Sequence, residues 1–346
     1  MGYSDQESIS NYQLFIAVIF INIATAIFFL PGEPVTILHQ NAWMAMIVAT
    51  FLEIVFGIYP LVTLAAAFPR RTMIQYSSQV LGRFGGKIIG LLLIFWFFQY
   101  HCWTLREFGE ISIIFLPETP LLVFVVILSA LTVYAVYQGI EVIVRCGEFI
   151  FPIGLFFLFL IGLVNLGSMD ISHLMPFFEV NVGQIIKASI SPLDWLSAAI
   201  GFGVLAGFVN NPQKVKMVGL LAACCSGMVL FAFTIMVLLV FGAGFLAKFT
   251  VPLLSLSEYI QLQGTEALVV AVWFSWIFMR TAIWSYITVI SIAQLLNLSD
   301  YRPLIMPETL LAVVYCIHQY KNFIELSYYF TVAHFLYLSF QLGIPL

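Results

Sequence analysis

The chain alternates long apolar stretches with short polar ones over its whole length. A helix that crosses a bilayer needs about 20 apolar residues, and ten stretches approach or exceed that length. They cover residues 12–31, 41–67, 87–106, 120–138, 142–166, 194–211, 216–243, 267–293, 303–319 and 325–345. The pattern predicts an all-α polytopic membrane protein with ten transmembrane helices. A reading with eight spans stays open, because Pro307 and Glu308 interrupt the ninth stretch and the tenth runs to the final residue, Leu346.

Composition agrees with this prediction. The 346 residues are 62% hydrophobic and 9% charged, with a mean hydropathy of +1.05, which leaves too few polar side chains to cover a globular surface. The apolar composition leads us to expect a lipid bilayer around the protein. The net charge of -4 is spread over the loops and forms no basic patch, so we expect no nucleic-acid partner. The first residues include acids where a secretory signal has Lys or Arg, so we expect no cleavable signal.

Two runs of small residues interrupt apolar stretches at matching places. They are Ile23-Ala24-Thr25-Ala26 in the first stretch and Ile200-Gly201-Phe202-Gly203 in the sixth. Such a pair indicates an inverted repeat of two five-helix halves, 12–166 and 194–345, within one transmembrane domain, 1–346. Unwound backbone inside hydrocarbon needs protein, water or a solute to satisfy its polar groups, so we predict a solute site at the bilayer midplane. For either run alone, close helix packing is the simpler explanation.

The backbone at these breaks predicts the chemistry of the solute. Free amides at the start of the outer half-helix, near Thr25 to Ile27, would attract a carboxylate. Freed carbonyls near Asn22 and Ile200 would face an ammonium group, so an amino acid fits the pair. Aromatic residues at helical spacing are candidate walls, although ordinary packing explains such stripes as well. They are Trp96, Tyr100 and Trp103 in the third stretch and Trp273, Trp276, Trp284 and Tyr286 in the eighth.

Arg280 stands in the middle of the eighth stretch. An ionisable side chain there is a functional candidate, because its insertion costs about 2.5 to 3.5 kcal/mol. Trp276 and Trp284 lie one turn away on either side and could hold it by cation-π contact. We expect Arg280 to bind the solute's carboxylate, or to pair with a membrane acid in a gating or structural bridge. The candidate acids are Glu53 and Glu148, and Arg145 could instead pair with Glu148.

Positive charges predict the orientation, because cytoplasmic loops retain Lys and Arg. With the N-terminus in the cytoplasm, eight cations lie inside: Arg70, Arg71, Arg83, Lys87, Arg145, Lys214, Lys216 and Arg302. Four lie outside: Arg106, Lys187, Lys248 and Lys321. We therefore expect a cytoplasmic N-terminus, an amphipathic segment at the inner interface over 68–87, and an outer connection over 167–192 that joins the halves.

The residue types of metal and enzyme sites do not cluster in the sequence. The five cysteines, Cys102, Cys146, Cys224, Cys225 and Cys316, lack metal-ligand spacing. There is no cofactor-binding loop and no nucleophile with a placed base, and the histidines are scattered. We expect no metal, no cofactor and no enzymatic activity.

A series of motifs resembles a known family. The motifs are Phe28-Phe29-Leu30-Pro31, Phe68-Pro69 with Val80-Leu81-Gly82-Arg83, Leu105-Arg106-Glu107-Phe108, Pro117-Glu118-Thr119-Pro120, Arg145, Trp273 and Leu298-Ser299-Asp300-Tyr301-Arg302-Pro303. Over nearly the whole length, this order resembles the B subunits of GerA-type endospore nutrient germinant receptors. These subunits are relatives of the amino acid/polyamine/organocation transporters.

The resemblance implies a ten-span protein of leucine-transporter type in the inner membrane of a bacterial spore. It implies a subunit that senses a small nutrient together with A-type and C-type subunits. Ala24, Thr25, Ala26, Gly201, Phe202, Gly203, Trp96, Tyr100, Trp284 and Tyr286 occupy the family's pocket positions. Family members often carry glutamate in the broken sixth span, where this chain has Gly203.

Two other functions fit the same residues. The first is an amino acid transporter of the same fold, coupled to protons through Glu53 or Glu148, since a fixed charge at Arg280 argues against a sodium site in the eighth span. The second is a scaffold whose pocket is filled by Phe202, Trp284 and their neighbours.

Overall fold

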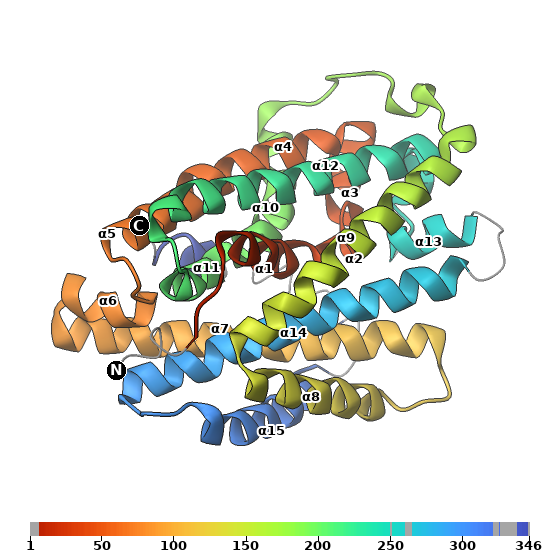
Figure 1. Ribbon diagram of the computed structural model, residues 1–346. Coiled ribbons are helices and arrows are strands. Elements are labelled where there is room, and N and C mark those ends of the chain that lie inside the picture. Colours follow the sequence, from red (N-terminus) through yellow and green to blue (C-terminus); the bar gives the residue numbers. More distant parts are fainter. Residues whose placement is uncertain (1–6, 250, 260–264, 321–324, 326–337, 345–346) are drawn as a thin grey trace.

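The computed structural model describes residues 7–249, 251–259, 265–320, 325 and 338–344. This part of the chain is a bundle of helices (Figure 1), and its one pairing of extended backbone is a short parallel bridge between Ile9 and Val209. The helices are α1 (Asn11–Ile23), α2 (Ala26–Phe29), α3 (Gly32–Leu38), α4 (Trp43–Leu52), α5 (Tyr59–Ala67), α6 (Met73–Val80), α7 (Gly82–Phe115), α8 (Leu121–Gln138), α9 (Ile140–Val164), α10 (Val182–Leu196), α11 (Phe202–Leu205), α12 (Val215–Leu246), α13 (Pro252–Tyr259), α14 (Thr265–Leu296) and α15 (Arg302–Gln319).

Eight candidate membrane spans confirm the polytopic, all-helical character. They are Asn11–Phe29, Trp43–Ala67, Gly82–Phe115, Leu121–Gln138, Ile140–Val164, Val182–Phe208, Pro212–Leu246 and Leu268–Leu296. Helix α15 forms where the ninth span is predicted, but it is not among the eight. The tenth predicted span, 325–345, lies mostly outside the described residues, so the count of ten stays a prediction.

The sixth span differs from its predicted start. Helix α10 begins at Val182, so the last part of the expected outer connection, 167–192, is helical. Asn181 caps this helix in a capping box with Gln184, and the polar side chains of its first turns are exposed. Hydropathy misses these turns because they are amphipathic. The division into halves at 166 and 194 stays a prediction.

Helix α1 and the sixth span form the centre of the bundle. In the most apolar stretch of the first span 78% of the residues are buried, and in that of the sixth span 89% are. In the corresponding stretch of α9 only 22% are buried. Figure 1 shows α1 and α11 surrounded by the longer helices, with α9 crossing in front of them. A helix whose sides are all apolar is stable when every side is buried. The two interrupted spans therefore lie where their backbone can meet only protein or a bound solute.

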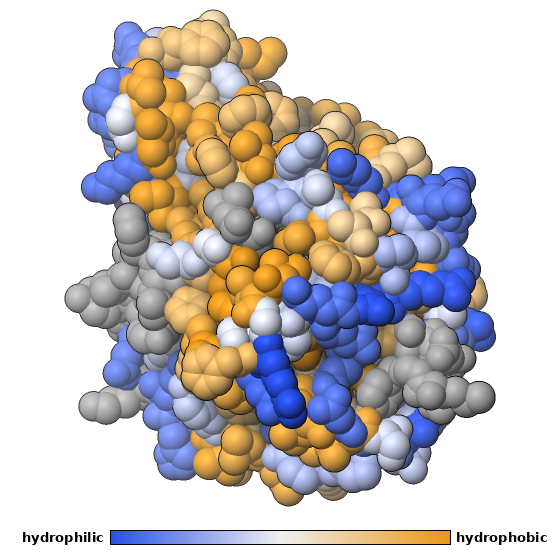
Figure 2. Space-filling model, turned by 90° about the vertical axis from the view of Figure 1, so that its left-hand side faces the viewer, coloured by the Kyte–Doolittle hydropathy of each residue, from blue (hydrophilic) through white to orange (hydrophobic). Residues whose placement is uncertain are grey.

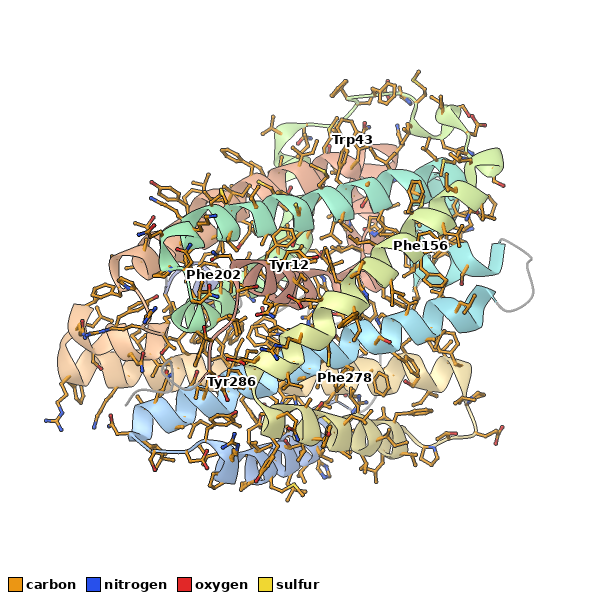
Figure 3. All side chains as sticks on the ribbon, in the orientation of Figure 1. Tyr12, Trp43, Phe156, Phe202, Phe278 and Tyr286 are labelled. Atoms are coloured by element: carbon orange, nitrogen blue, oxygen red, sulfur yellow. The ribbon has the colours of Figure 1, made fainter. Side chains whose placement is uncertain are left out.

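Figure 2 faces the end of the bundle that carries α6, where hydrophilic and hydrophobic patches lie side by side. Thr72 and Gln75 form a capping box that starts α6 within the predicted amphipathic segment. Arg70, Arg71 and Arg83 are exposed around it. On the outer sides of the long helices, aromatic and aliphatic side chains such as Phe156 project outward (Figure 3).

Candidate functional site

The first span is interrupted at the predicted small residues. Helix α1 ends at Ile23, Thr25 stands between the helices, and α2 has only four residues. The carbonyl of Ala24 accepts a hydrogen bond from Trp273 Nε1 of α14 at 3.1 Å. A helix as short as α2 has too few aligned peptide units to provide a strong dipole. Side chains, rather than a helix end, must therefore supply the charge at this break.

Arg280 provides that charge. Its side chain is 2% exposed, and Nη1 donates a hydrogen bond to the hydroxyl oxygen of Thr25. The guanidinium lies over the ring of Trp195 in α10, 5.5 Å from the ring centroid. The expected cation-π partners, Trp276 and Trp284, are not the ones found, and Trp195 of another helix takes that place. Arg280 thus joins the break in the first span to the eighth span and to α10.

The acids near Arg280 are not the ones that spacing suggested. Glu107 of α7 interacts electrostatically with Arg280 and lies beside Thr25. Asp194 of α10 also interacts with Arg280. Neither Glu53 nor Glu148 forms an ion pair with Arg280 among the described residues. A sequence does not show which side chains of distant helices face each other.

The remaining charge candidates have other surroundings. Arg145 is exposed and pairs with Glu141 at 3.5 Å, one turn earlier on α9, instead of with the half-buried Glu148. Glu53 begins a π-helical turn, Glu53–Ile58, that links α4 to α5. Its side chain is buried, and neither carboxylate oxygen has a hydrogen-bond partner among the described residues.

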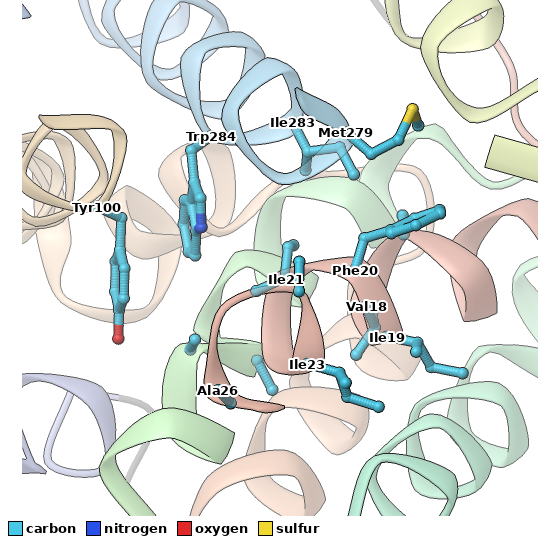
Figure 4. Packing of buried hydrophobic residues seen from close by; sticks show 14 of the residues in the cluster. Val18, Ile19, Phe20, Ile21, Ile23, Ala26, Tyr100, Met279, Ile283 and Trp284 are labelled. Carbon is cyan, nitrogen blue, oxygen red and sulfur yellow. The ribbon is translucent and has the colours of Figure 1, made fainter. Parts of the chain in front are cut away.

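Tyr100 of α7 connects these groups. It interacts electrostatically with Asp194, Arg280, Glu53 and Glu107. Its ring stacks on Trp284 with centroids 4.3 Å apart and planes 6° apart. Figure 4 shows this pair together with Ile21 of α1 and Ala26 of α2. We call Thr25, Tyr100, Glu107, Asp194, Trp195 and Arg280 the Arg280 cluster.

The sixth span changes its winding beside the first break. Residues Ser197–Gly201 form a 3-10 turn before the short helix α11. A Cβ atom on Gly201 would lie 3.2 Å from Ile21 Cδ1 and 3.2 Å from Trp284 Cη2. The missing side chain at Gly201 therefore allows α1, the sixth span and α14 to meet.

The other predicted pocket residues are dispersed around this point. Gly203 faces Met73 and Leu61 instead, since a Cβ there would approach Met73 Sδ to 3.1 Å. Phe202 is fully buried, with its ring next to Gly219 of α12. Trp96 is buried and stacks on Phe340 with centroids 5.0 Å apart. Figure 3 labels Phe202 and Tyr286.

Tyr286 belongs to a second polar group. Its hydroxyl donates to Glu7 Oε2 at 2.5 Å, and the hydroxyl of Tyr301 donates to Glu7 Oε1 at 2.8 Å. Gly139, at the corner between α8 and α9, has a φ of +90° and would bring a Cβ to 2.6 Å from Glu7 Oε1. Tyr286 thus secures the segment before α1 instead of lining the break.

Sequence reasoning missed Glu107, Asp194 and Trp195 as site residues. One signal was present for Glu107, because Trp96, Tyr100, Trp103 and Glu107 recur at helical spacing along one face of α7. Asp194 and Trp195 carried no comparable signal. Tyr100 interacts with three carboxyl groups, including Glu53, and with one guanidinium, so the site is suited to an added ammonium group or to protons.

The sequence matches a known family model, described as spore germination protein, over residues 8–324. Spore germination protein YndE of Bacillus subtilis (strain 168) is 24% identical over 333 residues, which cover 91% of this chain and 88% of that relative. Spore germination protein KB of the same strain is 25% identical over 358 residues, which cover 99% of this chain and 94% of that relative.

Solved transporters are similar in fold. MhsT in complex with L-phenylalanine matches with a TM-score of 0.68 at 12% identity, covering 98% of this chain and 88% of that one. A Na+-coupled sialic acid symporter in a substrate-bound outward-open state matches with a TM-score of 0.65 at 12% identity, covering 96% and 77%. These similarities confirm a leucine-transporter type of fold, and at this identity they show the fold alone.

Proposed function

Since the chain belongs to the spore germination protein family, we propose that it is the nutrient-binding B-type membrane subunit of a germinant receptor. It acts in the inner membrane of a spore with its N-terminus in the cytoplasm. It binds a small nutrient at the break in the first span and transmits the change to A-type and C-type subunits. The ligand can drive this change only if it binds one conformation better than the other.

The observation that carries the proposal is the chain of contacts from Arg280 through Thr25 to Glu107. Arg280 Nε is buried and has no hydrogen-bond partner among the described residues, so it is available to a carboxylate oxygen. Glu107 Oε2 is likewise buried without such a partner and is available to an ammonium group. An amino acid carries both groups. The structural similarity to a transporter solved with L-phenylalanine supports the same ligand class.

Substitution of Gly201 tests where the nutrient binds. We expect Gly201→Leu to abolish the nutrient response while the protein still inserts and assembles, because a side chain there enters the meeting point of Ile21 and Trp284. Gly244→Leu is the matched control, since a Cβ on Gly244 meets nothing within 4 Å. The readout is germination of spores that carry each variant at equal protein level. A normal response of the Gly201 variant would defeat the site.

Ligand identity is tested with the purified receptor complex. Each amino acid is added in turn and the melting temperature is measured, because a ligand that binds only the folded state raises it. We expect at least one amino acid to stabilise the protein, and to do so less in Thr25→Val. If no amino acid stabilises the unaltered complex, the amino acid proposal fails, and a scaffold with a filled pocket replaces it.

A second candidate function is favoured by Glu53. A buried carboxyl without a hydrogen-bond partner among the described residues is suited to carrying a proton, and so to a proton-coupled amino acid transporter. Uptake of amino acids into proteoliposomes under a proton gradient would identify that activity. Loss of uptake in Glu53→Gln, with ligand binding kept, would assign Glu53 as the coupling group.

A further inference from the structure

An apolar pocket also borders the break in the first span. Its volume is about 50 Å³, and α1, α2, α9, α12, α13 and α14 contribute to its walls. Ala24 lines it, together with Trp273, which donates to the Ala24 carbonyl. An occupant of this pocket would therefore touch the break directly, without entering the Arg280 cluster.

A larger apolar groove of about 420 Å³ runs between α9 and α12. Leu158 and Val229 line both the groove and the pocket, so the two hollows adjoin at these side chains, which we call the neck. Helix α9 is the most exposed of the candidate spans, which places the groove on the surface that faces lipid. Figure 1 shows α9 crossing the front of the bundle between α12 and α14. The pocket thus adjoins a groove on the surface that faces the hydrocarbon of the bilayer.

Trp276 adds one polar group to this apolar path. Its side chain is 7% exposed, and its Nε1 has no hydrogen-bond partner among the described residues. A Cβ atom on Gly154 would lie 2.0 Å from this nitrogen, so only glycine leaves room for the indole. Both residues line the pocket. An indole N–H buried among apolar groups costs free energy unless it finds an acceptor.

We propose that this pocket binds an alkyl chain that carries one hydrogen-bond-accepting oxygen and that arrives from the bilayer through the α9–α12 groove. The oxygen accepts from Trp276 Nε1, and the alkyl part lies between Leu158 and Val229. An alkyl chain is much narrower than a protein helix, which is about 10 Å wide and stays outside. The site is separate from the nutrient site, and its occupant modulates the break by packing against Ala24.

The test uses the full chain in lipid nanodiscs and a long-chain alcohol with a photoreactive diazirine on its alkyl part. After illumination, mass spectrometry maps the labelled peptides. We expect labelling near Gly154 in α9 and Trp276 in α14 that excess unlabelled alcohol abolishes, because a built site saturates. Labelling that spreads along the exposed face of α9 and resists competition would overturn the proposal.

Substitutions distinguish labelling that depends on the neck from labelling by general contact with lipid. Val229→Trp fills the neck and is expected to remove the competed labelling. Ile153→Trp is the control, because Ile153 is exposed on α9 and lines neither hollow. Trp276→Phe removes the donor, and one lost neutral hydrogen bond should weaken competition by the alcohol about fivefold. Unchanged competition in both Val229→Trp and Trp276→Phe would contradict the site.

The same labelling on the purified receptor complex distinguishes a protein occupant. If a partner subunit covers the groove, the label near Gly154 disappears in the complex and persists in the isolated chain, which also overturns the proposal. Labelling retained in the complex supports it.

Discussion

Arg280 donates a hydrogen bond to the hydroxyl of Thr25, two residues that are 255 positions apart in the chain. Ala24 and Thr25 lie between α1 and α2, so a buried cation is tied to the place where the first span lacks regular helix. Thr25 also lies beside Glu107, so its side chain stands between a cation and an acid from two further helices. Any group that displaces this hydroxyl changes how α7, α14 and the first span are held together.

Replacing Thr25 by valine should lower stability and ligand response together. Valine keeps the shape and removes the hydroxyl, so Arg280 Nη1 loses its partner. A hydrogen bond to a charged group contributes about 1.5 to 3 kcal/mol, and a loss of that order is expected. Thermal unfolding of the purified protein measures it. Thr63→Val is the control, because the Thr63 hydroxyl bonds only to the Tyr59 carbonyl on an exposed face.

Replacing Glu107 by glutamine should weaken the binding of a ligand that carries an ammonium group. The change keeps size and removes charge, and a charge-assisted hydrogen bond corresponds to a roughly ten- to hundredfold difference in affinity. Ligand-induced shifts in melting temperature report the change. Glu118→Gln, at an exposed loop position, should bind normally. Equal affinity in both variants would remove Glu107 from the site.

Replacing Glu7 by alanine should release the segment that precedes α1. Glu7 accepts from Tyr286 and Tyr301, and the same segment pairs with the end of the sixth span, where Ile9 donates to Phe208 and Asn210 donates to Ile9. Without the carboxylate, we expect faster hydrogen exchange at Ile9 and Asn210 and unchanged exchange in α12. Tyr12→Phe, on an exposed side chain, should change neither. Protection at Ile9 that survives the loss of Glu7 would show that the backbone bridge alone holds the segment.

Replacing His101 by alanine should be destabilising. His101 Nδ1 lies 2.7 Å from Glu308 Oε1 between α7 and α15, and both side chains are almost fully buried. Removing the imidazole takes one buried hydrogen-bond partner from Glu308, which keeps Ser285 and Thr309, so a cost of about 1 to 3 kcal/mol is expected. The double variant His101→Ala with Glu308→Ala should lose less than the sum of the single variants. Additive losses in thermal unfolding would mean that the two residues act independently.

Several features of this molecule follow from local physics and were predicted on that ground. Each bilayer crossing needs its own run of apolar residues. Hydropathy therefore predicted all eight spans, and the boundaries of most of them to within a few residues. Arg280 was predicted as a site residue because it is a cation within an apolar stretch. Runs of small residues indicated the regions around Thr25 and Gly201. These signals lie within single helices and need no knowledge of their neighbours.

Helix packing decided the rest. Glu107, Asp194 and Trp195 surround Arg280 because α7, α10 and α14 meet there, whereas the predicted acids Glu53 and Glu148 do not pair with it. Gly201 and Gly203 are two residues apart, and the winding of the sixth span turns one toward Trp284 and the other toward Met73. The sequence determined which segments enter the membrane and which groups are costly to bury there. Only the tertiary structure decided which of those groups satisfy one another, because that depends on the rotation of each helix about its own axis.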